Sequence, residues 1–105
     1  MGIKNALPAE RRILDFLCSE LKRLLPNATW TAAGIGRHQM EVISWVLERN
    51  ADGVRTGLED NVRITRDRLA CSNAELVQMA REACAKYGRR AATPAEARAL
   101  LQLER

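Results

Sequence analysis

Four ionic or amide side chains crowd the end of an otherwise apolar predicted strand: Arg55, Glu59, Asp60 and Asn61. Charged groups there are costly to bury unless they are paired or bind a metal. Arg55 and Glu59 share one face of an extended strand, and Gly57 leaves open space between them. The adjacent carboxylates Glu59 and Asp60 point apart on extended backbone, so one is suited to ligating a metal and the other to taking a proton. The same residues also fit a structural Arg–Glu pair beside a capped turn, and both interpretations stay open.

A second candidate site is the turn containing Gly34, Gly36 and Arg37, which connects a predicted strand to a predicted helix. Backbone N–H groups, the helix N-terminus and the Arg37 guanidinium are suited to a phosphate or a carboxylate. The spacing is not that of a dinucleotide or P-loop motif, so a tight structural turn is the competing interpretation. His38 is the single histidine of the chain, whereas a catalytic zinc usually takes about three protein ligands. We therefore expect no zinc site from this chain alone.

Apolar spacing, capping residues and turn residues predict the elements that must position these side chains. The predicted helices run from Pro8 to Leu25, from His38 to Arg49, from the Ser72 cap to Tyr87 and from Thr93 to Leu103, and the predicted strands cover Thr29–Ile35 and Gly53–Leu58. Because a single helix separates the strands, they should be parallel and joined by a right-handed crossover. Two parallel strands leave unpaired edges and make a poor sheet on their own. The pattern favours an α/β fold that is one piece of a larger barrel.

Composition narrows the class of protein. The chain has 105 residues, a net charge of +4 and 47% apolar residues, which are ordinary values for a single globular domain. Basic residues alternate with Asp and Glu along the predicted helices, which indicates a solvated surface and not a nucleic-acid-binding one. Cys18, Cys71 and Cys84 are too far apart for a zinc knuckle and odd in number. No apolar run reaches membrane-spanning length and no signal core is visible, so we expect a cytoplasmic protein with no membrane partner.

Four segments together carry a family resemblance. They are GIGRHQ (34–39), VRTGLEDN (54–61), SNAELV (72–77) and GRRAATPAEARALL (88–101). In this order they resemble the β-keto acid cleavage enzymes, a family that includes the 3-keto-5-aminohexanoate cleavage enzyme of lysine degradation. The likeness runs from about Asn5 to Leu103, and four motifs in the same order are far more specific than any one of them.

The resemblance implies a TIM barrel with a catalytic zinc. It also implies exchange of an acetyl unit between a β-keto acid and acetyl-CoA, which gives acetoacetate and a new acyl-CoA. Glu59 is similar to the glutamate that ligates the zinc after the last strand. Asp60 is similar to the catalytic acid/base beside it, and Arg55 to the arginine that orients the substrate or the base. Gly34, Gly36 and Arg37 fall in the preceding strand–helix loop, near the place of the coenzyme A phosphates.

The resemblance also implies that much of the enzyme lies elsewhere. A TIM barrel takes about 250 residues and eight strands, so we expect residues 1–105 to be a single partial domain, the C-terminal part of the barrel with about two parallel strands and four helices. Zinc would bind only when the missing ligands are supplied, and the fragment would be inactive alone. Expected partners are a small β-keto acid, a coenzyme A thioester, and the missing N-terminal part or a second copy. The alternative is a non-catalytic α/β fragment that acts as an oligomerisation or interaction module.

Overall fold

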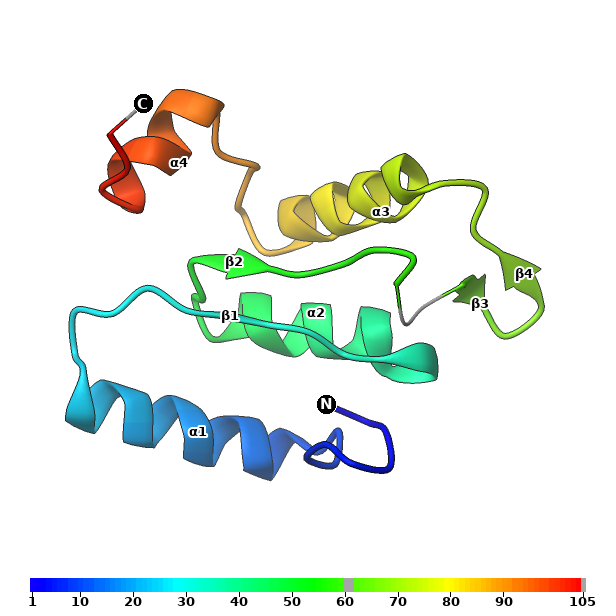
Figure 1. Ribbon diagram of the computed structural model, residues 1–105, viewed down its shortest axis with the longest axis horizontal. Helices are drawn as coiled ribbons and strands as arrows, with labels where there is room; N and C mark the ends of the chain where they lie inside the picture. The colour runs from blue at the N-terminus through cyan, green and yellow to red at the C-terminus, as the bar shows by residue number, and fades with distance from the viewer. Residues whose placement is uncertain (60–61, 105) are drawn as a thin grey trace.

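The structure is a computed structural model that describes residues 1–59 and 62–104. This part of the chain folds into helices and short strands, and the last two helices follow three consecutive strands (Figure 1). The helices are α1 (Arg11–Leu24), α2 (Gln39–Glu48), α3 (Asn73–Lys86) and α4 (Pro94–Leu100), and the 3-10 turn η1 (Gly36–His38) leads into α2. The strands are β1 (Thr31–Ala32), β2 (Gly53–Val54), β3 (Arg63–Thr65) and β4 (Arg68–Leu69). The predicted α/β class is confirmed as a small fold with two sheets of two strands each within the described residues.

Strands β1 and β2 form the predicted parallel pair. Thr31 lies opposite Gly53 and Ala32 opposite Val54, and α2 lies between the two strands along the chain. A further hydrogen bond of 3.2 Å runs from the Arg55 N–H to the Ala32 carbonyl oxygen. Both strands are shorter than predicted, because a strand extends only as far as a neighbour pairs with it. Within the described residues, each of these two strands has one neighbour.

Helix α2 is the centre of the core. Its sequence is apolar around most of its circumference, which is typical of a helix buried on more than one side. One cluster joins it to α1 and to the start of β2 through Leu14, Val42, Trp45, Val46 and Ala51. A second cluster joins it to α3 through Ile43, Leu47, Ala80 and Ala83. Helix α2 therefore has two buried faces, one toward α1 and one toward α3.

Helix α1 carries an apolar stripe along one side but buries little of it. Only Leu14 is buried among the α1 residues, whereas Phe16, Leu17 and Leu24 are exposed. A stripe of this kind needs a second surface to remove it from water. Within the described residues, α1 packs into the cluster that Leu14 shares with α2 and Ala51, against which Trp30 also packs.

The two predicted capping sequences begin α3 and α4. The Ser72 hydroxyl accepts a hydrogen bond of 3.2 Å from the Glu75 N–H, and Thr93 does the same for Glu96 at 3.2 Å. At α4 the capping box is complete, because the Glu96 carboxylate also accepts from the Thr93 N–H at 2.8 Å. At α3 the Glu75 carboxylate reaches one residue further and accepts from the Cys71 N–H at 2.6 Å.

An antiparallel hairpin of β3 and β4 follows β2 and was not predicted. Glu75 also ties this hairpin to α3, since its carboxylate receives the Arg68 guanidinium at 2.7 Å. The hydrogen bond from the Cys71 backbone, followed by the one from Arg68, lowers the pKa of Glu75 below its ordinary value. The position of the hairpin therefore depends on the same carboxylate that caps α3.

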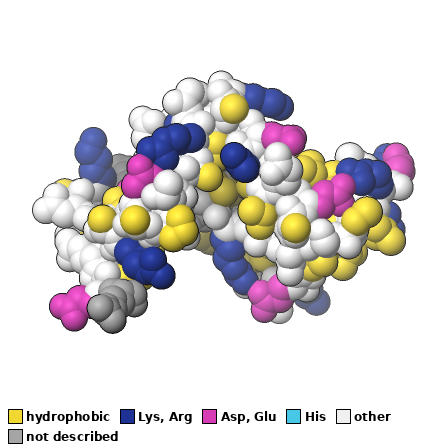
Figure 2. All heavy atoms as spheres, turned by 90° about the horizontal axis from the view of Figure 1, so that it is seen from above, with side chains coloured by type: hydrophobic (Ala, Val, Ile, Leu, Met, Phe, Trp, Pro, Cys, Tyr) yellow, Lys and Arg dark blue, Asp and Glu magenta, His cyan; other side chains and the backbone are white. Residues whose placement is uncertain are grey.

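The helices of the described part of the chain are too short or too polar to cross a bilayer. On the face that carries α3 and α4, exposed apolar side chains lie among Lys, Arg, Asp and Glu (Figure 2). The exposed large apolar residues from α3 to the end of the described chain are Val77, Leu100, Leu101 and Leu103. Apolar side chains exposed in this number extend the pattern seen on α1 to a second face of the molecule.

Candidate functional site

The residues that follow β2 bring Arg55 and Glu59 together, although β2 ends at Val54 and does not reach them. The Arg55 Nη2 lies 2.5 Å from the Glu59 Oε2. Both side chains face solvent, with 64% of Arg55 and 75% of Glu59 exposed. The geometry is that of the Arg–Glu pair that the sequence left open as a structural interpretation, and the pair is also accessible to a substrate. The catalytic role of Arg55 and the metal-ligand role of Glu59 stay predictions.

Two helix starts hold the segment that carries this pair. The Thr56 hydroxyl donates to Gln39 Oε1 at 2.6 Å, which fixes the segment to the start of α2. The Leu58 N–H donates to Asn73 Oδ1 at 2.7 Å, which fixes it to the start of α3. Gly57 adopts φ +155°, in a region that glycine populates far more readily than other residues. Sequence reasoning missed Gln39 and Asn73 as positioning residues, because their partners are distant along the chain.

The predicted acid/base residue Asp60 lies outside the described residues. Within residues 1–59 and 62–104, His, Cys, Asp and Glu side chains do not gather in a group of three that could hold a metal ion. Glu59 is paired with a cation, and His38 Nδ1 lies 3.4 Å from Glu41 Oε2. The described residues therefore do not fit a zinc ion by themselves.

The predicted phosphate-binding turn combines a packing role with an open surface. A Cβ on Gly34 would lie 2.3 Å from the His38 carbonyl oxygen, so this glycine allows close packing of the turn on α2. Gly36 adopts φ +64°, and a Cβ there would meet open space. Arg37 follows it in η1. Gly34 thus has the structural role that the sequence left open, while Gly36 and Arg37 face a hollow.

That hollow, the hairpin pocket, lies between η1, the start of α2 and the β3–β4 hairpin. Its volume is about 760 Å³, and its lining consists of Gly36, Arg37, Gln39, Met40, Val62, Arg63, Ile64, Thr65 and Arg66. The hairpin thus brings two further arginines, Arg63 and Arg66, to the turn that holds Arg37. Sequence reasoning missed both, because the short hairpin has little apolar alternation to mark it as two strands.

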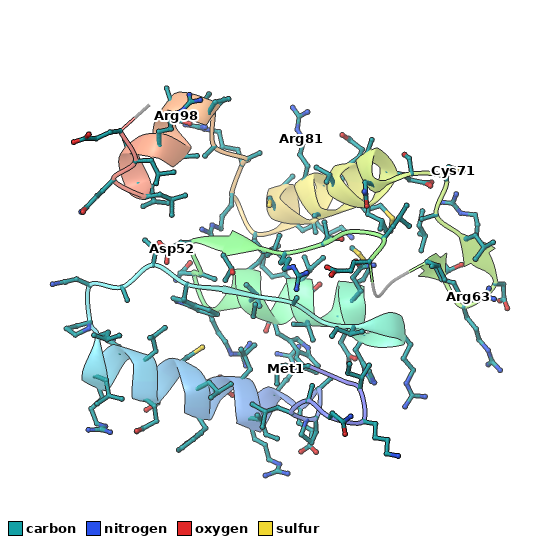
Figure 3. All side chains as sticks on the ribbon, in the orientation of Figure 1. Met1, Asp52, Arg63, Cys71, Arg81 and Arg98 are labelled. Carbon is teal, nitrogen blue, oxygen red and sulfur yellow. The ribbon has the colours of Figure 1, made fainter. Side chains whose placement is uncertain are left out.

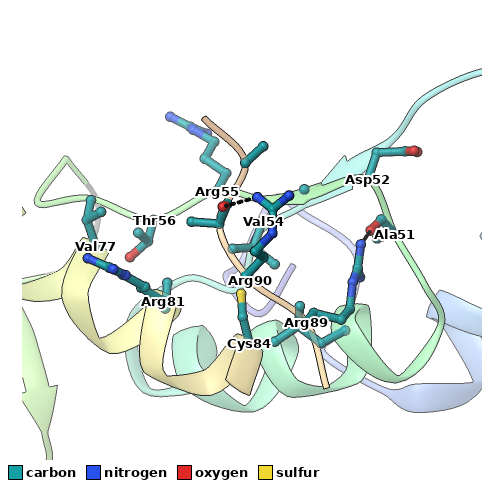
Figure 4. Close-up of a pocket in the computed structure, with 15 residues that line it drawn as sticks. Ala51, Asp52, Val54, Arg55, Thr56, Val77, Arg81, Cys84, Arg89 and Arg90 are labelled. Atoms are coloured by element: carbon teal, nitrogen blue, oxygen red, sulfur yellow. Dashed lines mark hydrogen bonds between the residues drawn. The ribbon is translucent and has the colours of Figure 1, made fainter. Parts of the chain in front are cut away.

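A second hollow, the helix groove, lies on another side of β2, against α3 and the segment that follows it. It has a volume of about 450 Å³. Figure 4 shows Arg55, Arg81, Arg89 and Arg90 around it. Arg89 donates to the Ala51 carbonyl oxygen at 2.6 Å, and Arg90 forms a salt bridge with Glu96 at 2.6 Å. Two of these arginines, Arg55 and Arg90, are therefore already paired with glutamates.

Residues 1–103 match the family model of the beta-keto acid cleavage enzymes. The chain belongs to this family. It is 54% identical over 103 residues to the 3-oxoadipate:acetyl-CoA acetyltransferase of Cupriavidus necator, covering 98% of this chain and 36% of that protein. It is 38% identical over 99 residues to the 3-keto-5-aminohexanoate cleavage enzyme of Fusobacterium nucleatum, covering 94% of this chain and 35% of that protein.

The chain therefore spans about a third of the length of these curated relatives. This coverage agrees with the expectation of a partial domain.

Proposed function

We propose that this chain is the C-terminal part of a beta-keto acid cleavage enzyme and supplies Arg55, Glu59 and Asp60 to its active site. The observation that carries the proposal is the exposed Arg55–Glu59 pair after β2. In a barrel of parallel strands, residues that follow the strands line the active site. The parallel pair of β1 and β2, with α2 between them in sequence, supports a place for this chain in a (β/α)8 barrel.

In the proposed reaction an acetyl unit passes between a β-keto acid and acetyl-CoA, which gives acetoacetate and an acyl-CoA. Arg55 binds the substrate carboxylate or orients the neighbouring acid/base, since a guanidinium suits a carboxylate in a two-point contact. Asp60 holds or gives up the proton that moves during the exchange. Glu59 would be one ligand of a zinc whose other ligands come from the remainder of the enzyme, and a bound zinc would polarise a substrate carbonyl.

A complementation experiment tests this proposal. The part of the Cupriavidus necator relative that this chain does not match is produced and combined with the chain, either mixed or fused. We expect zinc binding near one ion per complex, with acetoacetate formed from 3-oxoadipate and acetyl-CoA. The chain alone should bind far less than one zinc and form no acetoacetate. Metal analysis and product detection provide the two measurements.

Variants separate the proposed roles in the complemented protein. Glu59→Gln should lose zinc and activity together, whereas Asp60→Asn should lose activity and keep the zinc. Glu20→Gln is the matched control, because Glu20 also belongs to an exposed pair, with Arg23 at 2.7 Å. A Glu59→Gln variant that keeps full zinc content would contradict the assignment of Glu59, and an Asp60→Asn variant with full activity would contradict that of Asp60.

A non-catalytic interaction module is the second candidate, and the exposed apolar stripe of α1 favours it. In that case two copies would cover Phe16, Leu17 and Leu24 by packing their α1 helices together. The chain would then be a stable dimer in solution, measured by light scattering, and Leu17→Glu would convert it to a monomer. A monomeric chain that assembles only with the remainder of the enzyme would favour the first candidate.

A further inference from the structure

The hairpin pocket has the size and lining of a ligand site. Its volume of about 760 Å³ lies within the range of roughly 300–1,000 Å³ that small-molecule sites occupy. Two segments distant in sequence form its walls: the turn into α2 on one side and the β3–β4 hairpin on the other. Met40, Val62 and Ile64 provide apolar surface there, so the pocket combines apolar and basic walls.

The charged side chains of this lining all have one sign. Arg37, Arg63 and Arg66 line the pocket, and no acidic residue belongs to its described lining. Within residues 1–59 and 62–104 none of the three forms an ion pair, whereas other arginines of the chain pair with carboxylates. Arg63 Nη1 donates to the Arg66 carbonyl oxygen at 3.3 Å, which helps to hold the hairpin arginines in place. Arg37 Nε donates to His38 Nε2 at 3.2 Å. Guanidinium groups without a carboxylate partner among the described residues favour an anion with several acceptor oxygens.

Gln39 gives an independent indication of a ligand. Its side chain lines the hairpin pocket but is only 2% exposed. The Oε1 atom accepts from the Thr56 hydroxyl at 2.6 Å, and the buried Nε2 atom has no hydrogen-bond partner among the described residues. Buried donors of this kind are nearly always paired in folded proteins. A ligand oxygen in the pocket would satisfy this donor.

Gln39 also connects the pocket to the candidate active site. Thr56, which donates to it, is the residue after Arg55. The segment that carries the Arg55–Glu59 pair is thus anchored to a residue of the pocket lining. The co-substrate of the proposed function, an acyl-CoA, carries diphosphate and nucleotide groups at one end and a reacting thioester at the other.

We infer that the hairpin pocket binds the diphosphate end of a coenzyme A thioester, with Arg63 and Arg66 of the hairpin as specificity-determining residues. This inference rests on the proposed function, and it adds the hairpin arginines and Gln39 to the predicted turn of Gly36 and Arg37. The arginines take the phosphate oxygens in two-point contacts, and the buried amide of Gln39 donates to one of them. The apolar wall takes the nucleotide base.

Titrations of the 105-residue chain with coenzyme A and with inorganic pyrophosphate test the inference by calorimetry. We expect both to bind, and the Arg63→Gln/Arg66→Gln double variant to weaken binding about tenfold or more, since a charge-assisted hydrogen bond to an anion contributes on this scale. The charge-matched control is Arg81→Gln/Arg98→Gln. Figure 3 shows Arg63 on the hairpin and Arg98 on α4, at opposite ends of the molecule.

Several outcomes would overturn the inference. The first is that neither compound binds, and the second is an equal loss of affinity in the control variant. The third is an affinity for oligonucleotides that increases with their length, because this would indicate an extended nucleic-acid surface and not a pocket for one diphosphate. The side-chain amide signals of Gln39 in an NMR titration provide a second measurement that does not depend on the arginine variants. They should shift on addition of pyrophosphate and remain unchanged on addition of sodium chloride at equal ionic strength.

The titration and the complementation experiment can fail separately. Pyrophosphate binding to the chain needs neither zinc nor the remainder of the enzyme. If the chain binds pyrophosphate through the hairpin but the complemented protein forms no acetoacetate, the proposed function fails and the pocket stands. If acetoacetate forms and the hairpin double variant has an unchanged Michaelis constant for acetyl-CoA, the pocket assignment fails and the function stands.

Discussion

Helices α1 and α2 both carry large apolar side chains, but only α2 buries them. The side chains of Val42, Ile43 and Val46 in α2 are fully covered by α1, α3 and the parallel strands. On α1, Phe16 and Leu24 are more than 60% exposed. The neighbours that α2 needs lie within this chain, whereas those that the stripe of α1 needs do not lie among the described residues. One part of the molecule is thus complete, and another part has the surface of an interface.

The largest effect expected from this difference comes from truncating the α2 core. Ile43→Ala should lower the free energy of unfolding by about 2–5 kcal/mol, because it removes buried methyl groups and leaves a cavity between α2 and α3. The change is a large part of the total for a chain of this size, which is roughly 5–15 kcal/mol. Urea unfolding followed by circular dichroism measures it.

Leu17→Ala on α1 is the matched control, since it removes similar atoms from an exposed position. It should change the free energy of unfolding by about 0.5 kcal/mol or less. Equal losses at Ile43 and Leu17 would contradict the comparison, because they would mean that α1 is covered in solution. A loss at Leu17 that grows with protein concentration would identify a second copy as the cover.

Local signals made the starts of α3 and α4 predictable from the sequence. Ser72 and Thr93 cap α3 and α4 as their spacing from Glu75 and Glu96 predicts, because capping involves only residues within one turn. The parallel pairing of β1 and β2 was also predictable, since one helix separates them. The lengths of these strands were not, because a strand ends where its neighbour ends and not at a change of residue type.

The site was predictable only in part, for the same reason. An Arg55–Glu59 pair was one of the two interpretations that the sequence left open, and the structure forms it. The strand β2 ends at Val54, so the contact depends on the path of the segment after the strand and not on strand alternation. The contribution of Arg63 and of Gln39 depends on which segments fold against each other. No local pattern placed the hairpin beside α2, and a buried amide without a partner is visible only in three dimensions.

A smaller, local effect is expected at α4, which buries none of its residues. The Arg90 guanidinium, followed by the Thr93 N–H, lowers the pKa of Glu96 to about 2. The ion pair therefore stabilises α4 fully above the ordinary pKa of about 4.5, and this stabilisation is lost as the pH falls toward 2. The carboxyl carbon shift of Glu96 in an NMR pH titration measures the midpoint.

Arg90→Gln should return the pKa of Glu96 toward its ordinary value, so that α4 loses its cap at a higher pH. The signals of α2 should not follow the same midpoint, because the hydrogen-bond partners of Glu96 among the described residues, Arg90 and Thr93, lie outside the α2–α3 cluster. A change in the α2 signals at the Glu96 midpoint would mean that α4 is coupled to the core. It would contradict the conclusion that α4 is an exposed helix that unfolds independently of α2.

The smallest effect on stability is expected at the candidate site itself. Arg55 and Glu59 are mostly exposed, and exposed ion pairs contribute only about 0–1 kcal/mol to folding. Glu59→Gln should therefore leave the unfolding midpoint of the 105-residue chain within the range of the Glu20→Gln control. In the complemented enzyme the same variant should abolish zinc binding, while Glu20→Gln should not. A catalytic residue is expected to cost little stability and much activity when it is replaced, whereas a structural residue is expected to cost stability. A large loss of stability in the isolated chain would instead support the structural Arg–Glu interpretation.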